Sequence, residues 1–159
     1  RYSVSGDMTE PIVEQIMAAV RSRMAAFTLA FRSTAKASWQ PKDLSVHVHQ
    51  GPLTPNAEMS CPGNPPAQAY DLQAIVAGIT KPSDNDPTAI DTFRNRMAAD
   101  IVKNATDAAL WHQWGGLAIN TVIGTAEPYV EETGGMHGVM VPFLITFRTD
   151  ENNPYSVRS

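Results

Sequence analysis

The chain has 159 residues, of which 43% are hydrophobic and 18% are charged, a balance typical of a globular protein with few charges. The net charge of −4 and the lack of a basic block disfavour a protein that holds nucleic acid by neutralising its phosphates. No apolar run reaches the roughly 18 residues of a membrane-spanning helix, and the first ten residues lack a signal-peptide core. The lone cysteine, Cys61, excludes an intramolecular disulfide and a multi-cysteine zinc site.

The first predicted element is a long amphipathic helix that starts at Thr9 and runs to about Phe31. Thr9 can cap the helix, and Pro11 is tolerated in its first turn. Apolar residues recur at steps of three and four on one face, namely Ile12, Ile16, Met17, Val20, Met24 and Phe27. Residues 1–8 are polar, and we expect them to form a flexible arm.

Two strands joined by a long loop are predicted next. Residues 44–49 alternate between apolar and polar, which is the period of a half-buried strand. Residues 70–76 alternate again, and this strand is expected to end near Gly78. Residues 51–69 between them are rich in proline, which cannot donate in a sheet ladder, so an irregular loop is predicted there.

A second helix is predicted from Pro87 or Thr88 to about Leu110, after a break that offers capping side chains such as Asp86. Its apolar stripe consists of Ile90, Phe93, Met97, Ile101 and Ala105. Residues 117–130 then indicate a strand with a break at Gly124.

The closing strand is predicted over residues 139–148, after a glycine-rich hairpin loop at Gly134–Gly138. Its odd-numbered residues are apolar and share one face. Pro142 lies within it and is expected at a sheet edge or a bulge, because it has no N–H to donate. Residues 149–159 are polar and are expected to form a flexible, extended arm.

This order of elements predicts a single α+β domain over residues 1–159. The order is helix, strand, strand, helix, strand, strand, so the helices do not alternate singly with the strands. This pattern is typical of a mostly antiparallel sheet with both amphipathic helices packed on one face. The expected core comprises Ile16, Val20, Phe93, Met97, Ile101, Phe143, Ile145 and Phe147.

Two histidines on the first predicted strand are the most suggestive candidates for chemistry. His47 and His49 are two residues apart and point to the same face, so their imidazoles could ligate a metal. The sequence places no third ligand, and we expect neither residue to bind one. A solvated or interface face is the favoured interpretation.

The remaining candidates lack partners for catalysis. His137 lies in the glycine-rich loop, Cys61 has no assignable base, and Glu127, Glu131 and Glu132 lie near a strand end, where charges are normally solvated. His112 lies between Trp111 and Trp114, which indicates either a stacking site for a base or sugar, or a cluster that closes the core or a subunit contact. We therefore expect no catalytic residue, no metal and no cofactor. A small enzyme using His47, His49 or His137 remains the less favoured alternative.

The C-terminal third carries a series of short motifs: Trp114–Asn120, Glu127–Val130, Gly135–Gly138, Phe143–Thr149 and Asn153–Tyr155. Over residues 110–155 the chain resembles the minor tail and tail-terminator proteins of long-tailed bacteriophages. In those proteins a last strand of the form apolar-x-Ile-x-aromatic-Arg-Thr precedes a short polar Pro-Tyr segment. The order of helices and strands is also similar to the tail-terminator fold.

The resemblance implies a structural role in the virion. Tail terminators form a hexameric ring on the head-proximal end of the tail tube, stop its polymerisation and dock to the connector or stopper on the capsid. DNA passes through the ring without sequence-specific binding, and no membrane is involved. A location in the tail or neck of the virion follows, with assembly in the host cytoplasm. A tail-completion or head-completion protein of the neck is the alternative.

Subunit contacts are expected at residues that offer aromatic, proline or arginine surface in this region. These are Trp111, Trp114, Pro142, Arg148, Pro154 and Tyr155.

Overall fold

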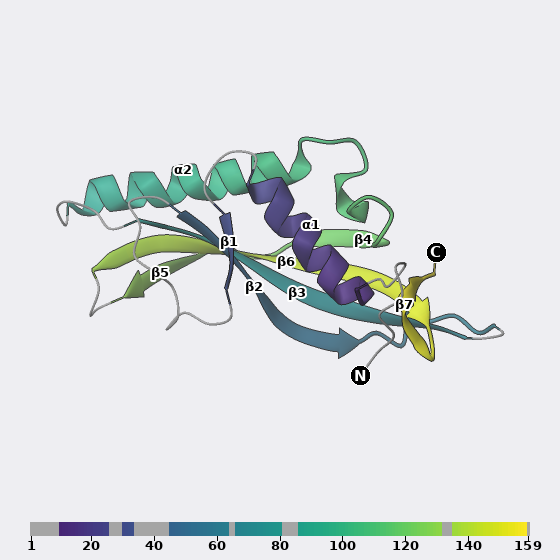
Figure 1. Ribbon diagram of the computed structural model, residues 1–159. Coiled ribbons are helices and arrows are strands. Elements are labelled where there is room, and N and C mark those ends of the chain that lie inside the picture. Colours follow the sequence, from purple (N-terminus) through teal and green to yellow (C-terminus); the bar gives the residue numbers. More distant parts are fainter. Residues whose placement is uncertain are drawn as a thin grey trace.

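The computed structural model describes residues 10–25, 30–33, 45–63, 66–80, 86–131 and 135–158. In this part of the chain one seven-stranded sheet carries its helices on one face, so the predicted α+β class is confirmed (Figure 1). The helices are α1 (Ile12–Met24), α2 (Pro87–Thr106) and the short 3-10 helix η2 (Trp111–Gln113). The strands are β1 (Ala30–Ser33), β2 (Ser45–Pro55), β3 (Ala67–Thr80), β4 (Asn120–Ile123), β5 (Glu127–Glu131), β6 (Met136–Asp150) and β7 (Asn153–Val157).

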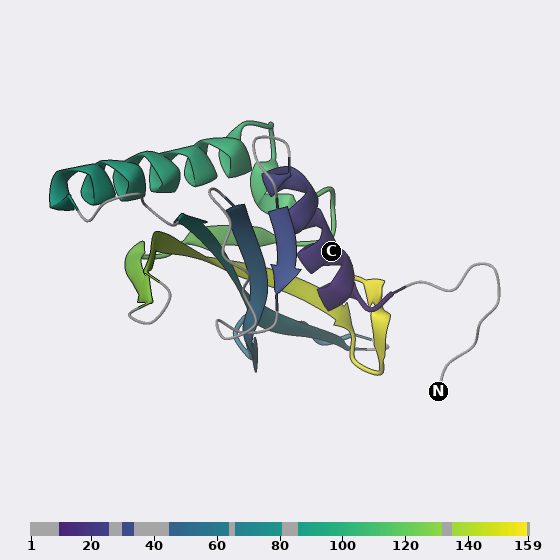
Figure 2. The same ribbon diagram turned by 60° about the vertical axis from the view of Figure 1, so that its left-hand side comes forward.

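The sheet runs in the order β1-β2-β3-β6-β4, and β5 and β7 also pair with β6. Its described pairings are antiparallel, except that β1 pairs with β2 in parallel. β3 and β6 form its centre, paired continuously from Ala67 opposite Asp150 to Thr80 opposite His137. Both helices lie on the same side of this centre when the molecule is turned (Figure 2).

The main core lies between the two helices and the sheet face they cover. The face presented by β6 is its odd-numbered series from Val139 to Phe147, as predicted, and β3 adds Leu72, Ala74 and Val76. Of the eight residues expected in the core, Phe93 is only half-buried, and the other seven are buried: Ile16, Val20, Met97, Ile101, Phe143, Ile145 and Phe147.

α1 is shorter than the sequence pattern predicted. It ends at Met24, and Phe31, the predicted end of the helix, belongs to β1, where it pairs opposite His47. Pro11 is the N-cap residue rather than part of the first turn. Hydrogen bonding of β1 to β2 competes with continuation of the helix there. The spacing of apolar residues along the chain cannot predict such a long-range pairing. Thr9 and Phe27 lie outside the described residues.

Both ends of the proline-rich segment are strand, so the predicted loop at 51–69 is too long. β2 continues to Pro55, and β3 begins at Ala67. The pairing of β2 with β3 shifts register between Gln50 and Leu53. Pro52 falls at this bulge, where a residue without an N–H breaks no ladder bond.

α2 begins as predicted and ends early. Asp86 caps it through a hydrogen bond from the Thr88 N–H, and Pro87 occupies the first turn. The helix ends at Thr106 rather than near Leu110, and Leu110 has a left-handed backbone with a φ of 56°. Leu110 therefore serves the turn into η2 instead of the helix.

Pro142 lies in an inner strand, so the predicted edge or bulge is wrong. It pairs opposite Ile75 of β3, and on its other side its carbonyl accepts a hydrogen bond from the Gly124 N–H at 2.8 Å. In an antiparallel ladder a residue's N–H and C=O point to the same side. The missing N–H of Pro142 therefore faces the break between β4 and β5, where the ladder is already interrupted.

Both ends of β6 are longer than predicted. Met136, His137 and Gly138 belong to the strand rather than to the hairpin loop. The segment after residue 148 is extended, as expected, but it is paired: β6 continues to Asp150, and β7 returns along it. The first eight residues, the other expected arm, lie outside the described residues.

Candidate assembly surface

Trp114 closes the core and offers almost no surface to a partner. Its side chain is 2% exposed, packs edge-on against Phe143 and donates from Nε1 to Thr121 Oγ1 at 2.8 Å. The Arg23 guanidinium lies 3.8 Å from the centre of its ring. The structure thus assigns Trp114 to the core, and its burial leaves almost none of its side chain for the subunit contact expected from the sequence.

Arg23 joins three elements beneath this ring. It donates to the Ala105 carbonyl near the end of α2, at 3.0 Å, and to the Trp111 carbonyl at 2.9 Å. Burial lowers the pKa of Arg23, because the charged form loses hydration. Sequence reasoning missed this residue, since only the fold brings positions 23, 105 and 114 together.

β7 is the most exposed strand of the C-terminal region. Tyr155 is 37% and Val157 40% exposed, and Pro154 is also exposed. The strand is held by its pairing with Thr149 and Asp150, by the Arg158 N–H on the Arg148 carbonyl and by an ion pair between Arg158 and Asp150. β7 thus presents apolar side chains without burying them in its own chain.

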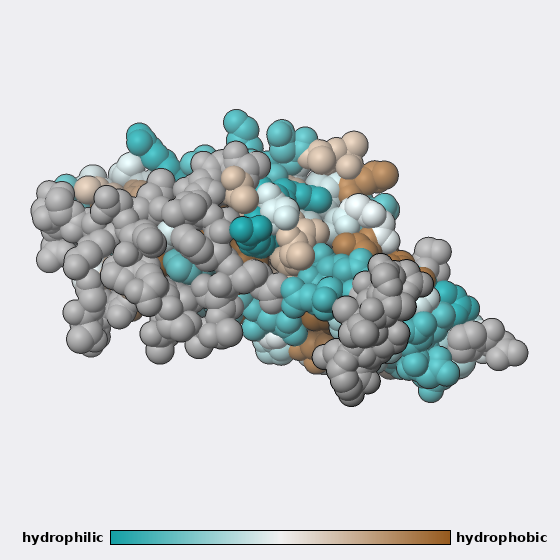
Figure 3. Space-filling model, in the orientation of Figure 1, coloured by the Kyte–Doolittle hydropathy of each residue, from teal (hydrophilic) through white to brown (hydrophobic). Residues whose placement is uncertain are grey.

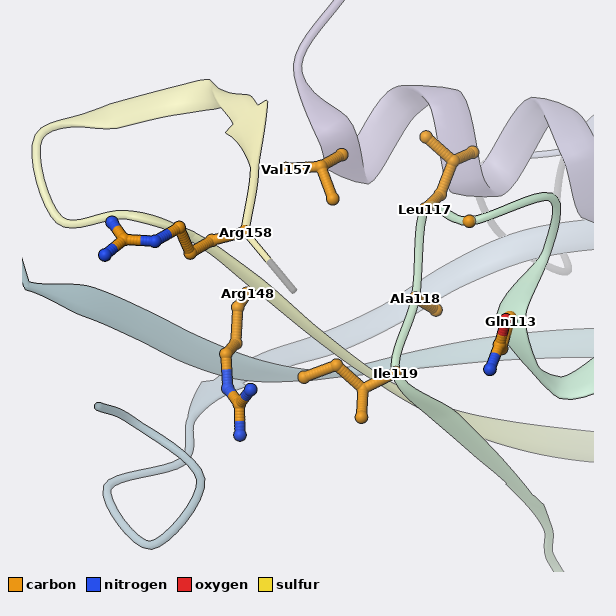
Figure 4. Close-up of a pocket in the computed structure, with 8 residues that line it drawn as sticks. Gln113, Leu117, Ala118, Ile119, Arg148, Val157 and Arg158 are labelled. Carbon is orange, nitrogen blue, oxygen red and sulfur yellow. The ribbon is translucent and has the colours of Figure 1, made fainter.

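A cavity of about 270 Å³ opens beside β7. Its lining comprises Gln113, Gly116, Leu117, Ala118, Ile119, Arg148, Val157 and Arg158. Leu117 and Val157 lie on the side near α1, and the two arginine side chains extend away from it (Figure 4). Arg148 donates from Nε to the Met59 carbonyl at 2.7 Å, so it fastens the end of the β2–β3 hairpin to the sheet.

A second cavity, of about 500 Å³, runs along α2 from Asp86 to Asp100. Phe93 and Met97 give it an apolar floor, and Asp86, Arg96 and Asp100 supply charges. Elsewhere along the helix, hydrophilic side chains stand outward at the top of the molecule (Figure 3). Sequence reasoning assigned Phe93 wholly to the core and therefore did not predict this groove.

The two strand histidines lie on the sheet face away from the helices, because they alternate along β2 with Val46 and Val48, which belong to the main core. His47 is 3% exposed, which corrects the solvated face expected for it. Burial lowers the pKa of His47, and the neighbouring charge of His49 lowers it further. The Ser45 hydroxyl lies 3.1 Å from His47 Nε2.

The other candidates are dispersed over the fold. His137 Nδ1 lies 3.4 Å from Arg94, which also donates to the Gly138 and Tyr129 carbonyls. Cys61 is half-buried, and its backbone bridges to Ala67. No group of three His, Cys, Asp or Glu side chains that could hold a metal occurs among the described residues.

η2 and β7 border the same cavity as Arg148, through Gln113 and Val157, so Trp111 of η2 and Pro154 and Tyr155 of β7 belong to elements at this end of the molecule. Pro142 lies on the sheet face away from the helices. That face also exposes Val122 of β4 and its cross-strand partner Leu144. The sequence shows that both residues are apolar, but only the pairing of β4 with β6 places Val122 next to Leu144.

None of the described helices is long and apolar enough to span a membrane. Comparisons with protein-family models and with curated proteins find no match. Among solved structures the chain is similar to a chain in the virion of a native gene transfer agent particle. The two share 15% identity with a TM-score of 0.42, and the similarity covers 93% of this chain and 99% of the other.

Proposed function

We propose that the protein is a structural component of a phage-type virion: a tail terminator that forms a ring of six copies on the head-proximal end of the tail tube and joins it to the connector or stopper. One observation carries this proposal. The closing motif that resembles tail terminators has one part buried in the core and one part exposed to solvent. Phe143–Phe147 has its aromatic and Ile side chains buried in β6, and Asn153–Tyr155 stands exposed on β7.

The physical reason lies in β7. A strand whose apolar side chains remain exposed adds little to the stability of its own chain, and a second chain can bury them. In a ring each copy uses two different surfaces for its two neighbours, and the contact closes when the rotation fits. Arg148, Pro154, Tyr155 and Trp111 are the contact residues that we propose at this end, with Pro142 on the sheet face.

The proposed role requires no catalytic residue, metal or cofactor. The protein would act in the tail or neck of the virion after assembly in the host cytoplasm, with DNA passing through the ring during ejection. A net charge of −4 suits that passage, because a lumen that is not basic lets DNA slide without being held.

The first test is the size of the particle in solution. Sedimentation and native mass measurement should give a mass six times that of the 17.3-kDa chain, and electron microscopy should show rings. Deletion of residues 151–159 should weaken assembly and leave the unfolding midpoint nearly unchanged, since none of residues 151–158 is buried. A protein that is monomeric at every concentration would contradict the proposal.

A second test separates a tail terminator from another ring of the neck. Purified rings are added to a tail-tube protein that is polymerising in vitro, and tube length is measured by electron microscopy. A terminator shortens the tubes and caps one end. Rings that leave tube length unchanged indicate a tail-completion or head-completion protein instead.

A further inference from the structure

We infer that the subunit contact of this ring joins the exposed end of β7 in one copy to the groove along α2 in the next copy. This inference rests on the proposed function for its assembly, and it names the two surfaces that meet. The β7 end consists of Tyr155, Val157 and Arg158. The α2 groove is the cavity lined by Asp86, Thr88, Ala89, Thr92, Phe93, Arg96, Met97 and Asp100.

Each surface has apolar groups that its own chain leaves partly open. Tyr155 and Val157 are more than a third exposed on β7, and Phe93 is half-buried although it belongs to the apolar stripe of α2. The groove volume of about 500 Å³ is large enough to accept side chains of this size. Joining the two removes apolar area from water on both sides.

Two ion pairs of opposite sign can form across this contact. Asp86 and Asp100 line the groove together with Arg96, and the β7 end carries Arg158 with Asp150 and Glu151 close by in sequence. Arg158 can meet one groove aspartate and Arg96 can meet one carboxylate of the β7 end, which leaves one carboxylate on each side without a cationic partner. Such an arrangement favours one register and disfavours others more than it adds affinity.

The two surfaces lie at opposite ends of the molecule. The N-terminal end of α2 and β7 are far apart both in Figure 1 and in the turned view of Figure 2. A contact between opposite ends is heterologous, so it leaves one free surface at each end of a pair and repeats from copy to copy until a ring closes.

Two single variants block the two surfaces separately. Thr92→Arg places a long cation in the groove from an exposed position, and Val157→Asp places a carboxylate on the β7 end. Matched controls are Asn95→Arg, which is exposed on the same helix outside the groove lining, and Val130→Asp, which is exposed on β5. We expect each blocking variant to weaken assembly about tenfold or more and each control to assemble as the wild type does.

Mixing the two blocked variants provides the decisive measurement. The Thr92→Arg copy keeps an intact β7 end, and the Val157→Asp copy keeps an intact groove. The mixture should therefore form one-to-one dimers in native mass spectrometry at a concentration at which each variant alone is monomeric. A thermal melt of each variant shows that it is folded.

The outcomes separate this inference from the proposed function. If both blocked variants still form rings like those of the wild type, or if the mixture stays monomeric, the inference is overturned and the proposed ring function is unaffected. A wild-type chain that never assembles overturns both.

Discussion

The side chain of Met97 on α2 occupies the space above Gly78 on β3. A Cβ atom built on Gly78 would lie 2.1 Å from Met97 Cγ and 2.7 Å from Met97 Sδ. The helix can approach the sheet this closely because position 78 has no side chain. This contact sets the distance of α2 from the centre of the sheet.

Gly78→Ala should therefore destabilise the protein through overpacking, by about 1–3 kcal/mol in urea unfolding. The double variant Gly78→Ala with Met97→Ala provides the control, since removal of the long side chain makes room for the new Cβ. Its loss should be smaller than the sum of the two single losses. Strict additivity would show that the two residues do not compete for the same space.

Arg23→Ala should cost about 1–3 kcal/mol, because it leaves the carbonyls of Ala105 and Trp111 without this donor and removes the cation over Trp114. Arg21→Ala on the exposed side of the same helix should change stability by about 0.5 kcal/mol or less. Equal effects in chemical unfolding would mean that the Arg23 contacts contribute nothing beyond helix propensity.

Phe147→Ala should cost about 3–5 kcal/mol, since Phe147 is buried in the main core and stacks on Tyr70. Phe93→Ala should cost clearly less, because Phe93 is half-buried beside the α2 groove. Guanidinium titrations of the two variants check the order. A larger loss at Phe93 would mean that the groove is closed in the folded monomer.

Stability should fall as the pH drops below the ordinary histidine value of 6.5. Burial, together with His49, lowers the pKa of His47 in the folded state, so between the lowered pKa and 6.5 the unfolded chain binds more protons than the folded chain. The full stability is present above pH 6.5 and declines as the pH falls toward the lowered value. His47→Gln should flatten this part of a curve of unfolding free energy against pH, and an unchanged slope would contradict the assignment.

We also predict that the protein retains no stoichiometric zinc, nickel or copper through purification. His47 and His49 share a sheet face, but no group of three potential ligands occurs among the described residues. Metal analysis of the purified protein checks this, and His47→Gln identifies the ligand if metal is found. One equivalent of metal lost in that variant would favour the enzyme alternative.

Local patterns alone were sufficient for several features. The odd-numbered face of β6 follows from the unbroken apolar series at odd positions from Val139 to Phe147. The start of α2 follows from Asp86 and Pro87, whose capping roles depend only on neighbouring backbone. The break at Gly124 was likewise predictable. In each case the energy that decides the structure arises within a few residues along the chain, so the sequence carries the signal directly.

Other features depended on partners distant in sequence. α1 ends before residue 31 because Phe31 pairs beside His47, Pro52 fits into β2 because a bulge frees it from the ladder, and β7 folds back on Asp150 instead of extending as an arm. His47 is buried and Phe93 remains half-open for the same reason. Burial and ladder hydrogen bonds belong to pairs of segments, so only the tertiary structure decided which surfaces of this protein are closed and which remain open to a partner.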